Sequence, residues 1–368
     1  MPDTDAPINV YEFEAAAQAK LPKMIYDFYA GGAYDGITLR ENREAYDRMR
    51  LAYRILQGVG QRDLSTTVLG HKVSMPILVP PVAFQGMVTK DGEVATAQAV
   101  SKVDTIMTLS TLSNTAVEDV VKAAGGKPVF FQLYIYKDRG ATRDLVQRAE
   151  AAGVKALVLT VDAPLWGKRE HDVHNHFTLP KGLFLKNLTS QMKELPTAAK
   201  DSGSGLESYV TSYFDSNLSW KDIEWLRDTT KVPLIVKGVA RGDDAVRAVE
   251  HGVAAIIVSN HGGRQLDTSS ATIDALPGVI EAVNGAVEVL VDGGIRRGTD
   301  VLKALALGAK AVQVGRPIIW GLAHGGSEGV VQVLEILRHE FDLAMALAGC
   351  KKVGDIKEDL IRKKCCNH

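Results

Sequence analysis

Eight short apolar runs, rich in Val, Ile and Leu, recur between residues 76 and 317 of this chain of 368 residues. Continuous apolar runs of this length are typical of strands buried on both faces of a parallel sheet. Segments with Ala, Val and Leu at helical spacing separate the runs, and several end in glycine, a common helix C-cap. The runs cover residues 76–84, 105–110, 129–134, 156–164, 233–238, 255–262, 288–294 and 311–317.

Eight repeats of strand and helix predict an α/β fold, a closed (β/α)8 or TIM barrel, because a doubly wound sheet usually has fewer strands. We expect one domain, with an N-terminal helical region at 1–75, a barrel core at 76–317, and C-terminal helices and a tail at 318–368. The longest gap between runs follows the fourth, and its residues 176–218 include KDSGSG. Such an insertion indicates a lid, with a surface loop of no function as the alternative.

The charge balance excludes several classes of partner. The formal net charge is −1 with acidic and basic residues interleaved, so we expect neither nucleic acid nor an anionic membrane as a partner. No apolar stretch approaches the roughly 20 residues of a membrane span, and the N-terminus does not resemble a signal peptide. Cys350, Cys365 and Cys366 do not lay out a disulfide framework. A cytoplasmic protein is the resulting prediction.

Polar residues gather where the predicted strands end. Because βα loops converge at the C-terminal face of a barrel, these side chains should meet in one site. Any one of them alone could cap a helix or sit satisfied in the core, but together they indicate a convergent polar site in an apolar wall. They are Gln132, Tyr134, Thr160, Asp162, Lys237, Ser259, His261 and Arg264.

Glycines and arginines follow the last two runs, in DGGIRRG (292–298) and GRP (315–317). Glycine lets backbone N–H groups approach an anion, arginine pairs with phosphate, and phosphate sites recur after strands seven and eight of this architecture. A phosphate-bearing cofactor is therefore predicted. NAD and ATP chemistry are disfavoured because neither G-x-G-x-x-G nor G-x-x-x-x-G-K-[ST] occurs in the expected context.

Three histidines, His171, His174 and His176, lie close together just after the fourth run. Neutral imidazoles are good metal ligands. However, no Cys, Asp or Glu completes a recognisable ligand spacing, so we expect no metal site here.

Several segments are close to motifs of the FMN-dependent α-hydroxy-acid oxidase and dehydrogenase family, which includes glycolate oxidase, lactate oxidase and mandelate dehydrogenase. These segments are KLPKMIYDFYAGGA, FFQLYIYKDR, LTVDAP, SNHGGRQLD and VDGGIRRGTDVLKALALGA. The chain resembles this family along nearly its whole length. The resemblance implies FMN as cofactor, small to medium 2-hydroxy acids as substrates, and a homotetramer. We expect O2 as the electron acceptor, because no haem-binding domain precedes the barrel and no apolar membrane-binding insert is evident in the long loop.

The same resemblance implies residue roles. His261 would be the catalytic base, Asp162 its partner, and Tyr134 a hydrogen-bonding group near the substrate hydroxyl. Arg264 and Arg169 would bind the substrate carboxylate, and Lys237 would face the N1–C2=O edge of the flavin. The flavin ring would contact Pro81, Val82, Ala83, Ser110, Gln132, Thr160 and Ser259, and the ribityl phosphate Asp292, Gly294, Arg296, Gly315 and Arg316.

Departures from the family pattern bear on the substrate. Phe28 replaces a tyrosine that touches the substrate carboxylate in many members, which removes a hydrogen bond to a charged group worth about 1.5–3 kcal/mol. Leu112 stands where glycolate oxidases have tryptophan, and Val82 where threonine is common. These residues predict a larger, more apolar pocket that favours L-lactate and longer or aromatic acids over glycolate.

Two rival functions stay open. A dehydrogenase of the same family would pass its electrons to a carrier or quinone instead of O2. A non-catalytic flavin-binding sensor would be expected to lack the base or the carboxylate-binding arginines, yet His261, Asp162 and Arg264 are all present.

Overall fold

Eight parallel strands form a closed barrel at the centre of the computed structural model, which describes residues 6–188, 194–195 and 204–363. The strand order is β4-β11-β10-β9-β8-β7-β6-β5, and a parallel bridge between Val79 and Met107 joins β4 to β5. The predicted TIM barrel is thus confirmed. The strands are β4 (Ile77–Leu78), β5 (Met107–Leu109), β6 (Val129–Leu133), β7 (Ala156–Thr160), β8 (Leu234–Val239), β9 (Ala255–Val258), β10 (Glu288–Asp292) and β11 (Ala311–Gln313).

Most strands are shorter than the apolar runs that predicted them. The run 156–164 forms β7 only as far as Thr160, and the run 255–262 forms β9 only as far as Val258. Beyond these points the chain turns into loops whose polar and glycine residues leave the buried ladder. The polar ends of the runs therefore become the C-terminal face of the barrel.

Side chains alternate between the barrel interior and the surrounding helices. In β7, Ala156 and Val158 are fully buried with the interior cluster, while Leu157 and Leu159 join the larger outer cluster. This is the period of two that a strand imposes. Val68 and Val73 pack with the interior cluster, so the hairpin of β2 (Thr66–Val68) and β3 (His71–Val73) covers one end of the barrel interior.

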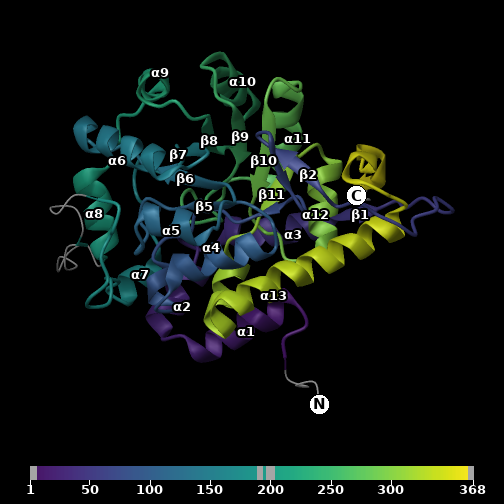
Figure 1. Ribbon diagram of the computed structural model, residues 1–368, viewed down its shortest axis with the longest axis horizontal. Coiled ribbons are helices and arrows are strands. Elements are labelled where there is room, and N and C mark those ends of the chain that lie inside the picture. The colour runs from purple at the N-terminus through teal and green to yellow at the C-terminus, as the bar shows by residue number, and fades with distance from the viewer. Residues whose placement is uncertain (1–5, 189–193, 196–203, 364–368) are drawn as a thin grey trace.

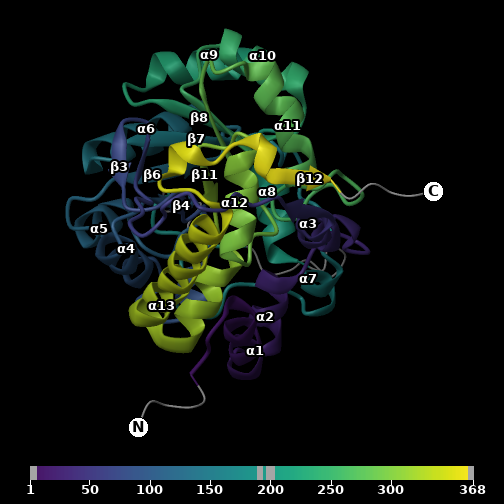
Figure 2. The same ribbon diagram turned by 90° about the vertical axis from the view of Figure 1, so that its right-hand side faces the viewer.

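Helices surround the barrel in both views (Figures 1 and 2). The longest, α13, leaves helical geometry at Gly325 and Gly326 and continues to a left-handed C-cap at Gly349. The helices that follow strands are α4 (Gly92–Lys102), α5 (Val117–Ala123), α6 (Arg139–Ala152), α9 (Trp220–Thr229), α10 (Gly242–Glu250), α11 (Thr272–Val283), α12 (Gly298–Ala306) and α13 (Arg316–Ala348).

The N-terminal region is helical only up to residue 48. It forms α1 (Val10–Lys20), α2 (Lys23–Ala30) and α3 (Ile37–Arg48), and α1 packs along α13 (Figure 1). The rest of the region holds β1 (Met49–Leu51) and the β2–β3 hairpin, and β1 pairs antiparallel with β12 (Ile361–Lys363). Short 3-10 helices cover Gln85–Met87, Val353–Asp355 and Glu358–Leu360.

The segment predicted as a lid contributes directly to the core. Its described part includes α8 (Gly205–Tyr213), which follows the short α7 (Glu170–His174), and Leu206 of α8 is fully buried. Residues 189–193 and 196–203 of this segment lie outside the described residues. Within the described ranges, no helix is both long and apolar enough to cross a bilayer.

Candidate active site

A cavity open to solvent lies at the C-terminal ends of the strands. This is the face of a barrel on which active sites are built. Apart from Asp162 and Ser259, every predicted site residue lines the cavity, and these two contact residues that do. The lining comprises Phe28, Pro81, Val82, Ala83, Ser110, Leu112, Gln132, Tyr134, Thr160, Arg169, Lys237, His261, Arg264, Asp292, Gly294, Arg296, Gly315 and Arg316, together with Trp166, Leu206, Gln313 and others.

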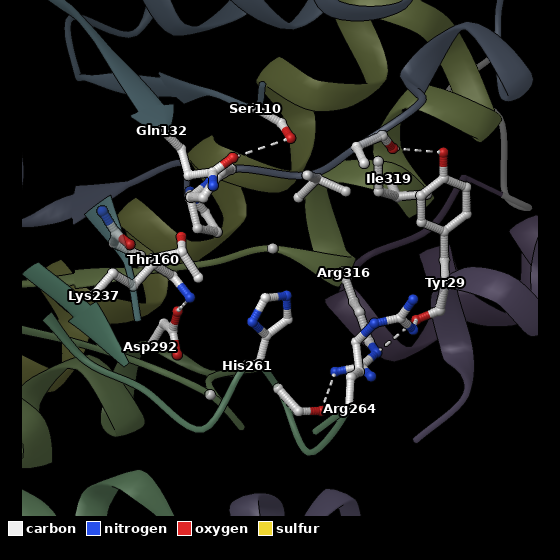
Figure 3. Close-up of a pocket in the computed structure, with 18 of the residues that line it drawn as sticks. Tyr29, Ser110, Gln132, Thr160, Lys237, His261, Arg264, Asp292, Arg316 and Ile319 are labelled. Atoms are coloured by element: carbon white, nitrogen blue, oxygen red, sulfur yellow. Dashed lines mark hydrogen bonds and ion pairs between the residues drawn. The ribbon is translucent and has the colours of Figure 1, made fainter. Parts of the chain in front are cut away.

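His261 projects into the middle of this cavity, between Lys237 and Asp292 on one side and Arg264 and Arg316 on the other (Figure 3). Its backbone adopts a left-handed conformation with φ of +58°, which is uncommon for a residue with a side chain. The Oγ of Ser259 accepts a hydrogen bond from the His261 N–H at 3.1 Å. Strain of this kind is typical of functional sites, where it aims a side chain.

Asp162 contacts the imidazole of His261 through Nδ1, which lies 2.9 Å from Oδ1 of the carboxylate. Gly238 has φ of +110°, and a Cβ there would lie 2.6 Å from the Cβ of Asp162, so only glycine admits this approach. Burial lowers the pKa of His261 below its usual value, although Asp162 acts to raise it. The imidazole is therefore neutral near pH 7 and free to accept a proton at Nε2.

Arg264 and Arg169 supply positive charge beside the histidine. Burial lowers the pKa of both guanidinium groups, and Arg264 further lowers that of Arg169. Asp172 lies beside Arg169, with 3.9 Å between Oδ2 and Nη1, and among the described residues the Nη1 atom has no hydrogen-bond partner. A buried cation with an unused donor at a cavity wall suits an anionic ligand.

The C-terminal end of α2 anchors two of the arginines. Arg264 donates from Nη1 to the carbonyls of Phe28 and Gly31, at 2.5 and 3.0 Å. Arg316 donates to the carbonyls of Tyr29 and Gly31, at 2.8 and 2.9 Å. The last carbonyls of a helix are unpaired and carry partial negative charge, so they attract cations. The N-terminal region thereby helps to build the site.

Lys237 lies in a buried ion pair on the opposite wall. Its Nζ donates to Ser259 Oγ at 2.8 Å and lies 3.2 Å from Asp292 Oδ2. Burial alone would lower the pKa of Lys237, but Asp292 and Asp162 raise it above its usual value. The ammonium group of Lys237 is therefore charged at neutral pH.

Unpaired polar atoms mark where a planar polar ligand fits. Ser110 Oγ and the Thr111 N–H donate to Gln132 Oε1 at 3.3 and 3.1 Å, which leaves Nε2 of this buried amide without a partner. Asp292 Oδ1 and both amide atoms of Gln313 are also unpaired. Buried polar groups are rarely left unsatisfied. These atoms fit the hydrogen-bonding edge of a flavin, and Gln313 is a residue that the sequence motifs did not indicate.

A second anion-binding subsite lies at Arg296 and Arg316. Both residues are partly buried, and desolvation together with Arg264 and Arg296 lowers the pKa of Arg316 to about 9. Burial also lowers the pKa of Arg296. Glu14, Asp292 and Asp300 act on these cations only from a distance, since neither arginine forms an ion pair with a carboxylate among the described residues. A phosphate group would supply a charge in direct contact. The residues present therefore fit the ribityl phosphate of FMN.

The remaining wall is apolar. Phe28 stacks on Phe177 with ring centroids 4.4 Å apart, and the guanidinium of Arg264 lies 5.0 Å from the Phe28 ring centroid. Leu112 is buried, and Trp166 and Leu206 complete the wall. The motifs did not indicate Trp166 or Leu206, although Trp166 follows the fourth run closely enough to have been considered.

The histidines of the alternative metal site do not gather. His171 faces Asp27, with 4.0 Å between Nδ1 and Oδ2, and its side chain is largely exposed. In the part of the chain that the structure describes, no group of three or more His, Cys, Asp or Glu side chains is placed to hold a metal ion.

Comparison with known proteins agrees with this geometry. The model of the FMN-dependent dehydrogenase family matches residues 17–363. The chain is 51% identical to L-lactate oxidase of a Nostoc strain, over 95% of this chain and 97% of that protein. It is 53% identical to glycolate oxidase 3 of Arabidopsis thaliana, over 96% and 95%. A crystal structure of mandelate oxidase with (S)-4-hydroxymandelic acid superposes with a TM-score of 0.92 at 39% identity, over 97% and 99%.

Proposed function

Because the chain belongs to the FMN-dependent dehydrogenase family, we propose that it oxidises (S)-2-hydroxy acids to 2-oxo acids and delivers the electrons to O2, giving H2O2. The observation that carries this proposal is the arrangement of the neutral base His261 and the arginines Arg264 and Arg169 around one cavity. This arrangement suits a 2-hydroxy acid: the arginines bind its carboxylate, and the base lies beside the hydroxyl on the carbon next to that carboxylate.

Substrate binding follows from the charges. Arg264 and Arg169 bind the carboxylate, and the guanidinium fork fixes its orientation. Tyr134 stays protonated because burial and Asp162 raise its pKa, so its hydroxyl is available as a donor near the substrate hydroxyl. His261 accepts a proton from the substrate, and Asp162 stabilises the imidazolium that forms. The product leaves as a 2-oxo acid after losing two electrons and two hydrogens, one of them as the proton on His261, and both hydrogens are balanced by the two protons of H2O2 once O2 has taken the electrons.

FMN, when bound, would supply a two-electron acceptor beside the substrate carbon. Pro81, Val82, Ala83, Ser110, Gln132 and Thr160 line the cavity and would contact the ring. Ser259 would act from behind this lining, through its hydrogen bond to Lys237. Lys237 would offset negative charge at the N1–C2=O edge. Arg296, Arg316, Asp292, Gly294 and Gly315 would hold the ribityl chain and phosphate.

The apolar wall supports a preference for L-lactate and longer or aromatic acids over glycolate. Leu112, Val82 and Phe28 all line the cavity and offer no polar atom. Trp166 also lines the cavity, where its ring packs on the guanidinium of Arg169. Apolar contacts discriminate by only about 1–3 kcal/mol per methylene, which makes the preference broad.

O2 is the proposed acceptor, since L-lactate oxidase, glycolate oxidase and 2-hydroxyacid oxidase are all among the relatives.

Leu206 of α8 reaches the cavity, which supports a lid role for residues 176–218. A cytoplasmic location and a homotetramer stay predictions, and light scattering on the purified protein checks the second.

Anaerobic reduction tests the proposal. Glycolate, L-lactate, 2-hydroxyoctanoate and L-mandelate are added separately to the yellow protein before air is admitted. We expect bleaching by L-lactate and the larger acids, followed by rapid recolouring with release of peroxide. Bleaching with slow recolouring would favour the dehydrogenase, and a flavin that none of the four acids reduces would refute the proposed chemistry.

A further inference from the structure

Gln265 is a buried amide just behind the active site, 9% exposed and next in the chain to Arg264. Its Nε2 donates to the carbonyls of Asp162 and Leu165, at 3.1 and 2.9 Å. Its Oε1 accepts from the Gly167 N–H at 3.1 Å and from Arg169 Nη2 at 3.4 Å. A primary amide has two N–H donors and an oxygen with two lone pairs, so this side chain is fully used.

All four partners belong to one loop, residues 162–169, which follows β7. The loop begins at the residue that orients His261 and ends at an arginine of the carboxylate site. Gln265 itself follows β9, on the same segment as His261 and Arg264. One side chain therefore connects the two segments from which the base, its partner and both arginines come.

Close backbone packing reinforces this connection. A Cβ at Gly167 would lie 2.5 Å from the carbonyl oxygen of Arg264 and 2.6 Å from Cα of Gln265, so only glycine lets the loop lie this near. Arg169 Nε also donates to the Arg264 carbonyl, at a long 3.3 Å. The Trp166 ring covers the Arg169 guanidinium, with Cζ 3.8 Å from the ring centroid. Gln265 and Gly167 together fix where the loop lies.

We propose that Gln265 is a positioning residue for the oxidation reaction, holding Asp162 and Arg169 in register with His261 and Arg264. The inference rests on the proposed function, because it assumes that His261 and Arg169 act on a 2-hydroxy acid. Gln265 does not line the cavity and acts only through the residues that it holds.

The amide chemistry explains why glutamine occupies this position. An ionised glutamate would have the same shape and could accept from Gly167 and Arg169, but it has no hydrogen to donate to the carbonyls of Asp162 and Leu165. Leucine would fill much of the volume and make none of the four bonds. Comparing the two variants with the wild type therefore distinguishes the effect of side-chain packing at residue 265 from the effect of its hydrogen bonds.

The experiment compares Gln265→Leu and Gln265→Glu with the wild-type flavoprotein on L-lactate. Gln147→Leu, at an exposed position of α6, serves as the control. For Gln265→Leu we expect kcat to fall and KM to rise, with kcat/KM lower by about 10- to 100-fold, the usual effect of misplacing catalytic groups. The affinity for acetate, followed through the flavin spectrum, should fall as well. Gln147→Leu should match the wild type.

The pH dependence of kcat/KM in Gln265→Glu distinguishes a positioning role from a merely structural one. Its deficit relative to the wild type should shrink as the pH falls, because a protonated carboxyl recovers one donor. If Gln265→Leu loses its flavin, Gly167→Ala displaces the same loop from its other side and should show the same rise in KM and fall in kcat.

Two results would overturn the inference. One is a Gln265→Leu flavoprotein with kcat, KM and acetate affinity within twofold of the wild type. The other is a Gly167→Ala protein with wild-type kinetics. A wild-type protein that oxidises none of the acids would refute the proposed function instead, and the acetate titration would still test whether Gln265 positions Arg169.

Discussion

Nδ1 of His261 lies 2.9 Å from Oδ1 of Asp162, although 99 residues separate them in the chain. The two residues follow β9 and β7, and β8 lies between these strands. The contact fixes the ring so that Nε2 faces the cavity. It also places the Asp162 carboxylate where it stabilises the protonated ring.

Asp162→Asn should therefore lower kcat/KM for L-lactate by about 100-fold, the scale of a lost acid–base contribution. The amide keeps the shape of the side chain but no longer stabilises the imidazolium. Steady-state kinetics measure the effect, with the exposed Asp144→Asn of α6 as control. A loss of less than threefold would mean that Asp162 is only a structural partner.

The pH dependence follows from the lowered pKa of His261. Because burial holds this pKa below its usual value near 6.5, the neutral base predominates at pH 7, and kcat/KM should fall only as the pH drops through the lowered pKa. A pH profile of kcat/KM checks this. An acidic limb centred above pH 7 would contradict the assignment of His261 as the base.

Phe28→Tyr should lower KM for glycolate and L-lactate. The ring lies beside Arg264 in the cavity wall, and a hydroxyl there could donate to the substrate carboxylate. A hydrogen bond to a charged group contributes about 1.5–3 kcal/mol, or roughly tenfold or more in affinity. KM and the acetate affinity measure it, and an unchanged value for both would show that the hydroxyl does not reach the ligand.

Leu112→Trp should reverse the proposed substrate preference. Leu112 is buried in the cavity wall, so an indole there would take up space that a longer or aromatic side chain needs. We expect kcat/KM for 2-hydroxyoctanoate and L-mandelate to fall about tenfold or more relative to glycolate, since overfilling a pocket excludes larger ligands. An equal change for all acids would place the side-chain pocket elsewhere.

Lys237→Met should destabilise the protein by about 3–5 kcal/mol, because it leaves the carboxylate of Asp292 buried and unpaired. The double variant Lys237→Met/Asp292→Asn should recover part of this loss. Urea unfolding of both proteins measures the difference. Equal stabilities would show that water or another cation already compensates Asp292.

Much of the fold was predictable because its signals are local. The apolar run of β7 and the helical spacing of α6 are each contained in a few turns of chain. Once eight such units are recognised, the barrel topology brings their polar ends together, which is why His261, Lys237 and Gln132 could be placed in one site before their distances were known.

Other features depend on contacts between distant segments. The pairing of β1 with β12 joins the two ends of the chain, and the β2–β3 hairpin covers the barrel where the sequence predicted helix. Trp166, Leu206 and Gln313 line the cavity without belonging to a recognised motif. No periodicity in the sequence marks such residues, because their roles arise from neighbours far along the chain.

The amino-acid sequence by itself determined the repeating strands and helices, the barrel that they close, and the family motifs with their charged residues. Tertiary structure alone decided how these residues act on one another. The burial that lowers the pKa of His261, the α2 carbonyls that anchor Arg264, and the amide of Gln265 that binds two loops together all require folding. Local propensity acts over a few residues, whereas desolvation and hydrogen-bond geometry exist only where distant segments meet.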